Sequence, residues 1–272
     1  MKQTLQYKCS TIAYHIFGTG GEVLFCFHGY GLTGKSFAVL QPVLGTDFTF
    51  ICIDFPFHGG TDWQEGLFFS VEDLWDIMTT LNPKPEIPFS LMGYSMGGRI
   101  SMCLLQAFPK QISQMALVAP DGLKFNWWQE LATHTIIGNH LFRYTMRCPK
   151  WLFAVIPMAG KLGLISKSIE KFAEGHINDT RARQLLYQRW CAMRVYNPRL
   201  GLLRTLINQY KIPVNLLFGE FDKIITTSQG IAFKKNEPLI IVKEIRCGHQ
   251  LLKDKYAADV AGLLVKKVEI DK

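Results

Sequence analysis

The sequence predicts an α/β fold in which a mostly parallel sheet is flanked by helices and interrupted by a helical insertion. Short, continuous apolar runs recur along the chain, and such runs are typical of strands buried on both faces. Helical patterns separate most of these runs, and strands that alternate with helices pair in parallel. Residues 122–200 break the alternation with a long block that is rich in aromatic residues and has several helical patterns. These observations together define the fold class.

The elements follow in chain order. Residues 6–18 alternate like strands, with a hairpin turn expected near Ser10-Thr11. Six buried strands are then expected at Val23–Phe27, Phe48–Ile53, Phe89–Met92, Met115–Val118, Val214–Phe218 and Leu239–Val242. Helices are expected between and after them at Val71–Leu81, Gly98–Phe108, Thr226–Lys235 and Leu251–Lys267. We therefore expect a core domain made of residues 1–121 and 201–272, with residues 122–200 inserted into it as a helical cap.

Composition describes an ordinary globular protein of 272 residues, with 48% hydrophobic and 19% charged residues. No apolar run reaches the ~18 residues of a membrane-spanning helix, and residues 1–6 lack the apolar core of a signal peptide. The seven cysteines are scattered and several lie in apolar runs, which favours free thiols and a cytoplasmic location. Because no Cys-x-x-Cys pair exists and His134 and His140 are badly spaced to share a metal, we expect neither a metal nor a cofactor.

The net charge of +8 is concentrated in the insertion. Residues 122–200 contain twelve basic and four acidic residues, whereas the rest of the chain is neutral. Such a basic face is most simply a solvated surface, but it also suits an anionic substrate or peripheral contact with an anionic membrane. No nucleic-acid-binding motif accompanies the charge, so nucleic acid is not an expected partner.

Residues 93–97, Gly-Tyr-Ser-Met-Gly, follow an apolar strand and precede a helical pattern. A serine between two glycines at a strand-to-helix turn is the pattern of a nucleophile elbow, in which the small flanking residues permit a tight turn. Such a turn would expose the hydroxyl of Ser95 at the carboxyl edge of the sheet. It would also direct the first amides of the following helix at the group that Ser95 attacks.

Four other polar segments also follow expected strands: His28-Gly29, residues 54–61, residues 219–222 and Gly248-His249. In open α/β sheets, ligands bind beyond the carboxyl ends of the strands, so these segments are expected to meet Ser95 at one edge. A serine hydroxyl needs a base to take its proton, and the base needs a carboxylate to fix its tautomer. The segments supply such residues in the order Ser, Asp, His.

These segments resemble those of cap-bearing α/β-hydrolases of the esterase- and lipase-like kind, and the resemblance covers nearly the whole chain. It implies an eight-stranded sheet with an inserted helical cap. It also implies that Ser95 is the nucleophile, His249 the base and Asp222 the carboxylate that orients His249. The backbone N–H groups of Tyr30 and Met96 would then stabilise the oxyanion.

Several assignments depart from the family pattern or stay open. Asp222 lacks the proline that often follows the acid, and some members place the acid where this chain has Asp121. The Gly-x-x-Asp context favours Asp222. Candidate substrate-binding residues are His28, Tyr94, Arg99, Trp127 and Trp128. Each also has a structural interpretation, as a loop histidine, an ion-pair partner or part of the core of the insertion.

Because the residue at the elbow is serine rather than aspartate, the expected reaction is acyl transfer to water from a small-molecule ester, thioester or related acyl bond. The elbow followed by Arg99 also resembles that of the menaquinone-pathway lyase that makes succinyl-hydroxycyclohexadiene carboxylate, in which a triad abstracts a proton.

Residues 29–36 match the P-loop pattern G-x-x-x-x-G-K-[ST], but Pro42 would break the helix that a P-loop needs. A hydrolase-fold binding protein without catalysis is a further alternative.

Overall fold

The structure, a computed structural model, describes residues 2–149, 151 and 179–264. They separate into two compact units. The first, here the sheet unit, is drawn from residues 1–64, 70–124 and 196–272. The second, here the helical unit, is drawn from residues 65–69 and 125–195.

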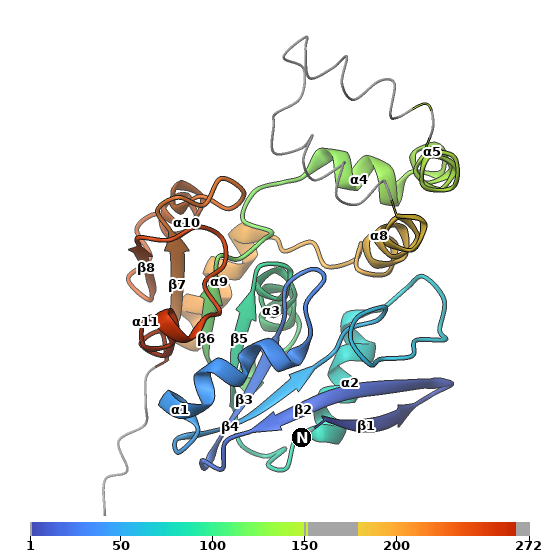
Figure 1. Ribbon diagram of the computed structural model, residues 1–272. Coiled ribbons are helices and arrows are strands. Elements are labelled where there is room, and N and C mark those ends of the chain that lie inside the picture. The colour runs from blue at the N-terminus through green and yellow to red at the C-terminus, as the bar shows by residue number, and fades with distance from the viewer. Residues whose placement is uncertain (1, 150, 152–178, 265–272) are drawn as a thin grey trace, which may run out of the picture. The chain divides into compact units, whose positions relative to one another are not determined.

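An eight-stranded sheet forms the frame of the sheet unit among the described residues (Figure 1). The strands run in the order β1-β2-β4-β3-β5-β6-β7-β8. The β1–β2 and β2–β4 pairs are antiparallel, and every other neighbouring pair is parallel. Their bounds are β1 Lys2–Tyr7, β2 Ser10–Phe17, β3 Glu22–Phe27, β4 Phe48–Ile53, β5 Phe89–Tyr94, β6 Ile112–Val118, β7 Val214–Gly219 and β8 Ile240–Ile245.

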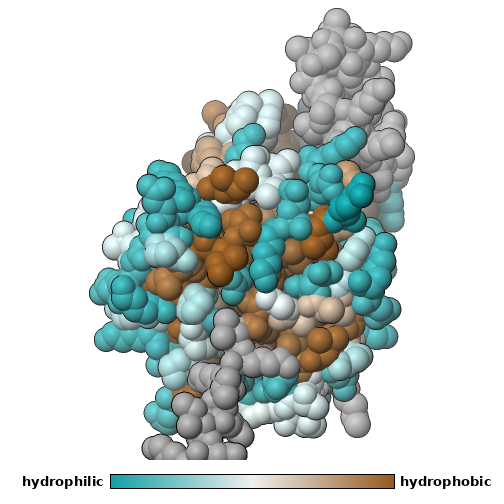
Figure 2. All heavy atoms as spheres, turned by 90° about the vertical axis from the view of Figure 1, so that its left-hand side faces the viewer, coloured by the Kyte–Doolittle hydropathy of each residue, from teal (hydrophilic) through white to brown (hydrophobic). Residues whose placement is uncertain are grey.

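The expected mostly parallel sheet is confirmed, with two local differences. The hairpin turn lies at Lys8-Cys9, two residues before the expected position, since Tyr7 pairs with Ser10 and Lys8 adopts a φ of +53°. The last strand is not buried on both faces. As the edge strand, β8 exposes Lys243 and Glu244, and charges on an edge discourage pairing with another chain. Figure 2 shows this side of the molecule, where apolar surface lies among polar residues.

Helices cover both faces of the sheet (Figure 1). On one face α3 packs between α2 and α9, and on the other α1 contacts α11. The bounds are α1 Gln41–Leu44, α2 Val71–Leu81, α3 Met96–Ala107, α9 Leu200–Tyr210, α10 Thr227–Lys234 and α11 Ala257–Ala261. The long helix expected at Leu251–Lys267 is wrong in its first half, because successive tight turns occupy residues 249–253 before α11. Its residues 265–267 lie outside the described residues.

The start of α2 is fixed by a capping box and by contacts with the first hairpin. Ser70 Oγ accepts from the amide of Asp73, and the Asp73 carboxylate accepts from the amide of Ser70. The same carboxylate accepts from Tyr7 Oη at 2.8 Å and pairs with Lys8 Nζ at 2.5 Å. Burial acts to raise the pKa of Asp73, but the Lys8 and Ser70 contacts outweigh it and lower the pKa to about 2. Asp73 therefore joins β1 to α2 through its charged form.

Replacing Asp73 with alanine is expected to lower the free energy of unfolding by about 2 kcal/mol at pH 7. Because the folded-state pKa lies below the ordinary 3.8, this contribution is complete above that value and is lost as the pH falls through about 2. Urea unfolding at pH 7 and pH 3 measures it, and the difference from wild type should shrink to about half at pH 3. Glu72→Ala, an exposed first-turn control, should change stability little. A pH-independent loss in Asp73→Ala would contradict the ionic origin.

The helical unit consists, among its described residues, of three packed helices and a short segment from an earlier part of the chain. The helices are α4 Trp127–His134, α5 Ile136–Arg147 and α8 Thr180–Ala192. The ring of Phe142 on α5 lies 5.4 Å from that of Tyr187 and 5.5 Å from that of Trp190. The segment Glu65–Phe69 joins this unit, because the amide of Phe69 donates to the carbonyl of Ala192. Nothing in the sequence pattern indicated that these five residues belong with the helices.

All seven cysteines are free thiols. Cys9, in the β1–β2 turn, and Cys148, at the end of α5, are exposed, and the other five are buried. Burial raises the pKa of Cys103 to about 12 and also raises that of Cys52. Buried thiols of this kind are chemically inert. No helix among the described residues combines the length and apolarity needed to cross a membrane.

Candidate active site

The turn between β5 and α3 forces Ser95 into an unusual backbone conformation, with φ +52° and ψ −115°. Non-glycine residues rarely occupy positive φ, so the surroundings must enforce it. The amide of Ser95 donates to Val118 O at 3.0 Å, and its carbonyl accepts from the amide of Asp121 at 2.9 Å. Close packing adds to this constraint, since a Cβ on Gly97 would overlap the carbonyl oxygen of Phe27. A Cβ on Gly93 would likewise overlap that of Gly97. The turn therefore has the geometry of a nucleophile elbow.

Three side chains from three strand ends meet at this elbow. Ser95 follows β5, Asp222 follows β7 and His249 follows β8. The Nε2 atom of His249 lies 3.2 Å from Ser95 Oγ, and its Nδ1 atom lies 2.6 Å from Asp222 Oδ2. The three side chains form one continuous hydrogen-bonded chain. The Asp222 side chain is fully buried, whereas that of His249 is 23% exposed.

The surroundings of Asp222 keep it ionised. One carboxylate oxygen accepts from the amides of Ile224 at 2.8 Å and Ile225 at 3.0 Å, while the other faces His249. Burial acts to raise the pKa of Asp222, but the hydrogen bonds from His249 and these amides outweigh it, so the pKa lies below 3.8. An ionised carboxylate only accepts, so Nδ1 of His249 carries the proton and a neutral ring leaves Nε2 as the acceptor for the Ser95 hydroxyl.

Asp121, the alternative acid, lies elsewhere. Its carboxylate accepts from the amide of Gly122 and lies 3.6 Å from Nε of Arg99. The side chain of Arg99 is 12% exposed and that of Asp121 is 33% exposed, so the pair is partly shielded from solvent. The geometry thus places Asp222 against His249 and pairs Asp121 with Arg99.

The loop after β3 brings Tyr30 close to the nucleophile. A Cβ on Gly29 would lie 3.3 Å from Cβ of Ser95, so the loop backbone passes directly beside the serine. Met96 is the first residue of α3, where an amide has no acceptor within its own helix. Of the two amides named from the sequence, that of Tyr30 follows the residue packed beside Ser95 and that of Met96 follows Ser95 itself.

His28 has a structural position rather than the substrate-binding one that the sequence suggested. Its side chain is fully buried. Nε2 accepts from the amide of Phe55 at 3.1 Å, and Nδ1 lies 2.8 Å from the carbonyl of Gly29. With both ring nitrogens bonded to backbone, His28 ties the Gly29-Tyr30 loop to the segment after β4.

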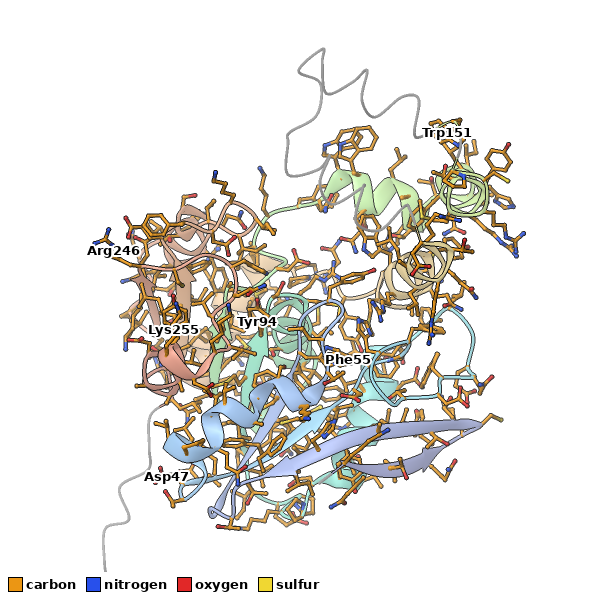
Figure 3. All side chains as sticks on the ribbon, viewed as in Figure 1. Asp47, Phe55, Tyr94, Trp151, Arg246 and Lys255 are labelled. Carbon is orange, nitrogen blue, oxygen red and sulfur yellow. The ribbon has the colours of Figure 1, made fainter. Side chains whose placement is uncertain are left out.

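Tyr94, labelled in Figure 3, lies at the end of β5 and is only 5% exposed. Its hydroxyl donates to the carbonyl of His249 at 2.9 Å, and the two rings lie 5.5 Å apart. The ring also packs closely against Gly29, where an added Cβ would lie 3.0 Å from Cδ1 of Tyr94. Burial, with a smaller contribution from the charge of Asp222, raises the pKa of Tyr94 to about 12. The hydroxyl therefore remains a donor at neutral pH and holds the loop that carries His249.

Replacing Tyr94 with phenylalanine is expected to lower kcat about tenfold with little change in KM. The substitution keeps the ring packing but releases the backbone of His249 from the hydroxyl. Steady-state kinetics with a chromogenic ester measures the effect, alongside the melting temperature. Tyr14→Phe removes an exposed hydroxyl that contacts Gln3 and serves as the control. A loss in melting temperature without a loss in kcat would show that the contact is only structural.

Trp127 and Trp128 lie at the start of α4 in the helical unit. Their rings stack with centroids 3.7 Å apart, and they are 53% and 62% exposed. They are therefore not part of a packed core of the described residues, which was the alternative interpretation of the aromatic residues in this block. Their role in substrate binding stays a prediction.

The P-loop pattern at residues 29–36 does not have P-loop structure. Residues Gly34–Leu40 form a 3₁₀ helix followed by the four-residue α1, rather than one long helix. Asp54 follows the next strand, β4, where a P-loop protein carries a magnesium-binding aspartate. Here its carboxylate accepts from the amides of Gly34 at 2.7 Å and Gly60 at 3.0 Å. Among the described residues, no cluster of three or more potential metal ligands occurs.

Comparison with known proteins agrees with this geometry. A family model described as the alpha/beta hydrolase fold matches residues 22–255. The pimeloyl-[acyl-carrier protein] methyl ester esterase of Chromobacterium violaceum is 30% identical over 241 residues, which cover 84% of this chain and 86% of that protein. A serine hydrolase-like protein of Danio rerio is 30% identical over 107 residues, but the chain spans only 32% of its length.

Solved structures show the same fold. The α/β hydrolase MGS-M2, from a deep-sea metagenome library of the Medee basin, superposes with a TM-score of 0.69, 16% identity and 99% coverage of both chains. The strand order, the elbow at Ser95 and the family match over most of the sequence lead to one conclusion: this chain is a member of the α/β-hydrolase family.

Proposed function

We propose that the protein is a serine esterase that cleaves a small-molecule carboxylic ester through an acyl-enzyme on Ser95. The observation that carries this proposal is the hydrogen-bonded chain from Ser95 Oγ through His249 to Asp222. A serine hydroxyl is a weak nucleophile until a base takes its proton, and this chain supplies the base in the required tautomer.

In the first half of the reaction, Ser95 Oγ attacks the ester carbonyl carbon while Nε2 of His249 takes the hydroxyl proton. The tetrahedral intermediate then collapses, the bond to the alcohol oxygen breaks, and His249 returns the proton to the leaving alcohol. In the second half, His249 takes a proton from water, which attacks the acyl-enzyme, and Ser95 regains its proton as the acid leaves. Asp222 stays ionised throughout and stabilises the imidazolium.

The backbone N–H groups of Tyr30 and Met96 are proposed to stabilise the oxyanion of each tetrahedral intermediate. The position of the Gly29-Tyr30 loop beside Ser95, and of Met96 at the start of α3, supports this assignment. In related chemistry, one such donor contributes about 3 kcal/mol to the transition state.

The comparisons and the charge distribution support a proposal for the substrate class. The relative from Chromobacterium violaceum is named for hydrolysis of a methyl ester on an acyl chain, which supports an ester of a small alcohol as the scissile bond. We propose that the helical unit is a cap that selects the acyl group, and that the basic excess of residues 122–200 favours an anionic substrate.

A panel of substrates with one acyl group tests the proposal. Purified protein should hydrolyse p-nitrophenyl butyrate with a burst of p-nitrophenol equal to the enzyme concentration, and methyl butyrate more slowly. Butyryl thioesters should be poorer substrates than the matched oxygen esters. Preference for the thioester would reassign the protein as a thioesterase, and absence of both burst and turnover would favour a non-catalytic binding protein.

The lyase alternative needs cations for substrate carboxylates, and the sequence offered Arg99 and the basic residues of 122–200 as candidates. Since Arg99 is mostly buried and paired with Asp121, no observation favours that reaction over ester hydrolysis.

A further inference from the structure

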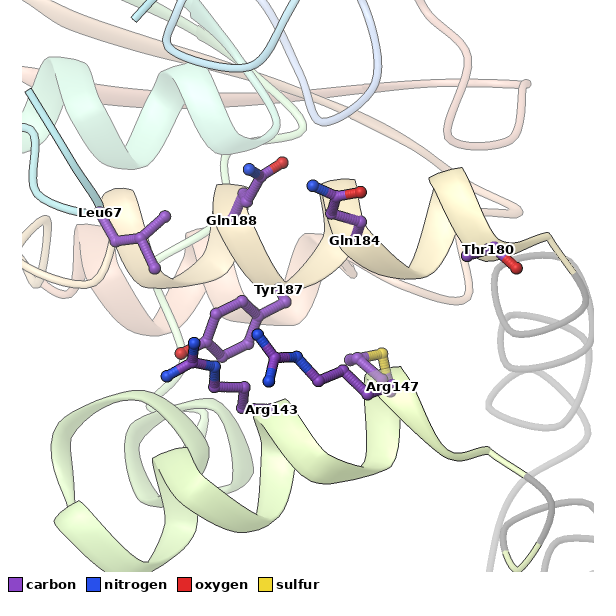
Figure 4. Close-up of a pocket in the computed structure, with 8 residues that line it drawn as sticks. Leu67, Arg143, Arg147, Thr180, Gln184, Tyr187 and Gln188 are labelled. Atoms are coloured by element: carbon purple, nitrogen blue, oxygen red, sulfur yellow. The ribbon is translucent and has the colours of Figure 1, made fainter. Parts of the chain in front are cut away.

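A pocket of about 600 Å³ lies within the helical unit, between α5 and α8 (Figure 4). It contains none of the residues that we assign to ester hydrolysis. Two arginines of α5, Arg143 and Arg147, line one side, and Thr180, Gln184 and Tyr187 of α8 line the other. No carboxylate is among the described residues of its lining, so these residues together carry a net positive charge.

The two arginines lie close together on α5, and both are exposed to solvent. They lie four residues apart on α5, a spacing at which like charges repel on the same helix face. Among residues 2–149, 151 and 179–264, neither guanidinium has an ion-pair or hydrogen-bond partner. Both reach from α5 toward α8, with the ring of Tyr187 between the helices (Figure 4). Burial raises the pKa of Tyr187, and the charges of both arginines act to lower it.

The other lining groups define the kind of anion that fits. The Thr180 hydroxyl accepts from Arg183, so its proton remains available to a ligand, and the Gln184 amide adds further donors. Guanidinium groups bind phosphate in a bidentate manner, and a dianion matches two unpaired positive charges better than a single carboxylate does. The side chains of Leu67 and Met146 with the Tyr187 ring offer apolar surface for the rest of a molecule.

We propose that this pocket binds the phosphate group of a small phosphorylated molecule, with Arg143 and Arg147 pairing with the phosphate oxygens. The apolar side of the pocket holds the organic part of the ligand. The proposal concerns binding within the helical unit and does not depend on the reaction proposed for Ser95.

Calorimetric titration of the full chain with phenyl phosphate tests this site. Wild type should bind phenyl phosphate, and Arg143→Gln and Arg147→Gln should each weaken binding about tenfold. The double variant should show no measurable binding. Arg181→Gln is the matched control, because Arg181 is an exposed arginine of α8 that does not line the pocket, and it should change the affinity less than about twofold.

Two further probes separate the contribution of the aromatic ring to binding from that of the second negative charge. Inorganic phosphate should bind the same site more weakly than phenyl phosphate, since it lacks the ring, and benzoate should bind more weakly because it carries one charge. Equal weakening in Arg181→Gln would reduce the effect to general attraction by a basic surface and overturn the proposal. Benzoate binding as tight as that of phenyl phosphate would overturn the preference for phosphate, and no binding to wild type would overturn the site.

Discussion

Replacing Ser95 with alanine is expected to lower kcat for ester hydrolysis about 10⁶-fold. The substitution removes the hydroxyl that lies 3.2 Å from His249 Nε2, and therefore removes the proposed covalent intermediate. The oxyanion amides remain, so a small residual rate above that of water is expected. A fluorophosphonate probe, which reacts with activated serines, should label the wild type at one site and leave Ser95→Ala unlabelled.

Ser36→Ala is the matched control for this experiment. Ser36 lies in the segment that matches the P-loop pattern, and its hydroxyl donates to the carbonyl of Thr33. Its replacement should leave both labelling and kcat unchanged. Retained turnover in Ser95→Ala would disprove the proposed nucleophile. An equal loss of turnover in Ser36→Ala, with an intact fold by circular dichroism, would show that the loss is not specific to Ser95.

Replacing Asp222 with asparagine is expected to lower kcat about 10⁴-fold, whereas Asp121→Asn should lower it only slightly. An asparagine at position 222 can present its NH₂ group to His249, which favours the tautomer with the proton on Nε2. That tautomer cannot accept the Ser95 proton. Asp121 contacts Gly122 and Arg99 instead, so its replacement weakens an ion pair without changing His249.

Steady-state kinetics of the two variants at pH 7, with melting temperatures measured in parallel, provides the comparison. Because the pKa of Asp222 is lowered, its carboxylate is charged at every pH at which the wild type would be assayed, and the contrast should hold across that range. Full activity in Asp222→Asn would refute the assignment, and a large loss in Asp121→Asn alone would transfer the role to Asp121.

The sequence predicted the sheet and the meeting of the candidate residues for one physical reason. The carboxyl ends of parallel strands share an edge, so motifs that follow β5, β7 and β8 must lie near one another wherever the intervening helices run. The glycine spacing around Ser95 adds a local constraint that few other turns satisfy. Burial on both faces likewise made the central strands readable as continuous apolar runs.

The contacts that the sequence did not predict join residues that are far apart along the chain. Tyr94 donates to the carbonyl of His249, 155 positions away, and a hydroxyl carries no pattern that identifies its acceptor. Arg99 pairs with Asp121 because α3 faces the loop after β6, and the sequence pattern does not reveal that arrangement. The final helix was expected to begin at Leu251, because apolar periodicity does not reveal that tight turns around His249 occupy the backbone there.

The distribution of the free thiols gives an experimental advantage. Cys9 lies on the sheet unit and Cys148 on the helical unit, and both are exposed, while the other five cysteines are buried. Maleimide dyes react with accessible thiols, so the natural chain presents one attachment point on each unit. Energy transfer between a donor and an acceptor at these two points would report in real time whether the units move relative to each other during turnover.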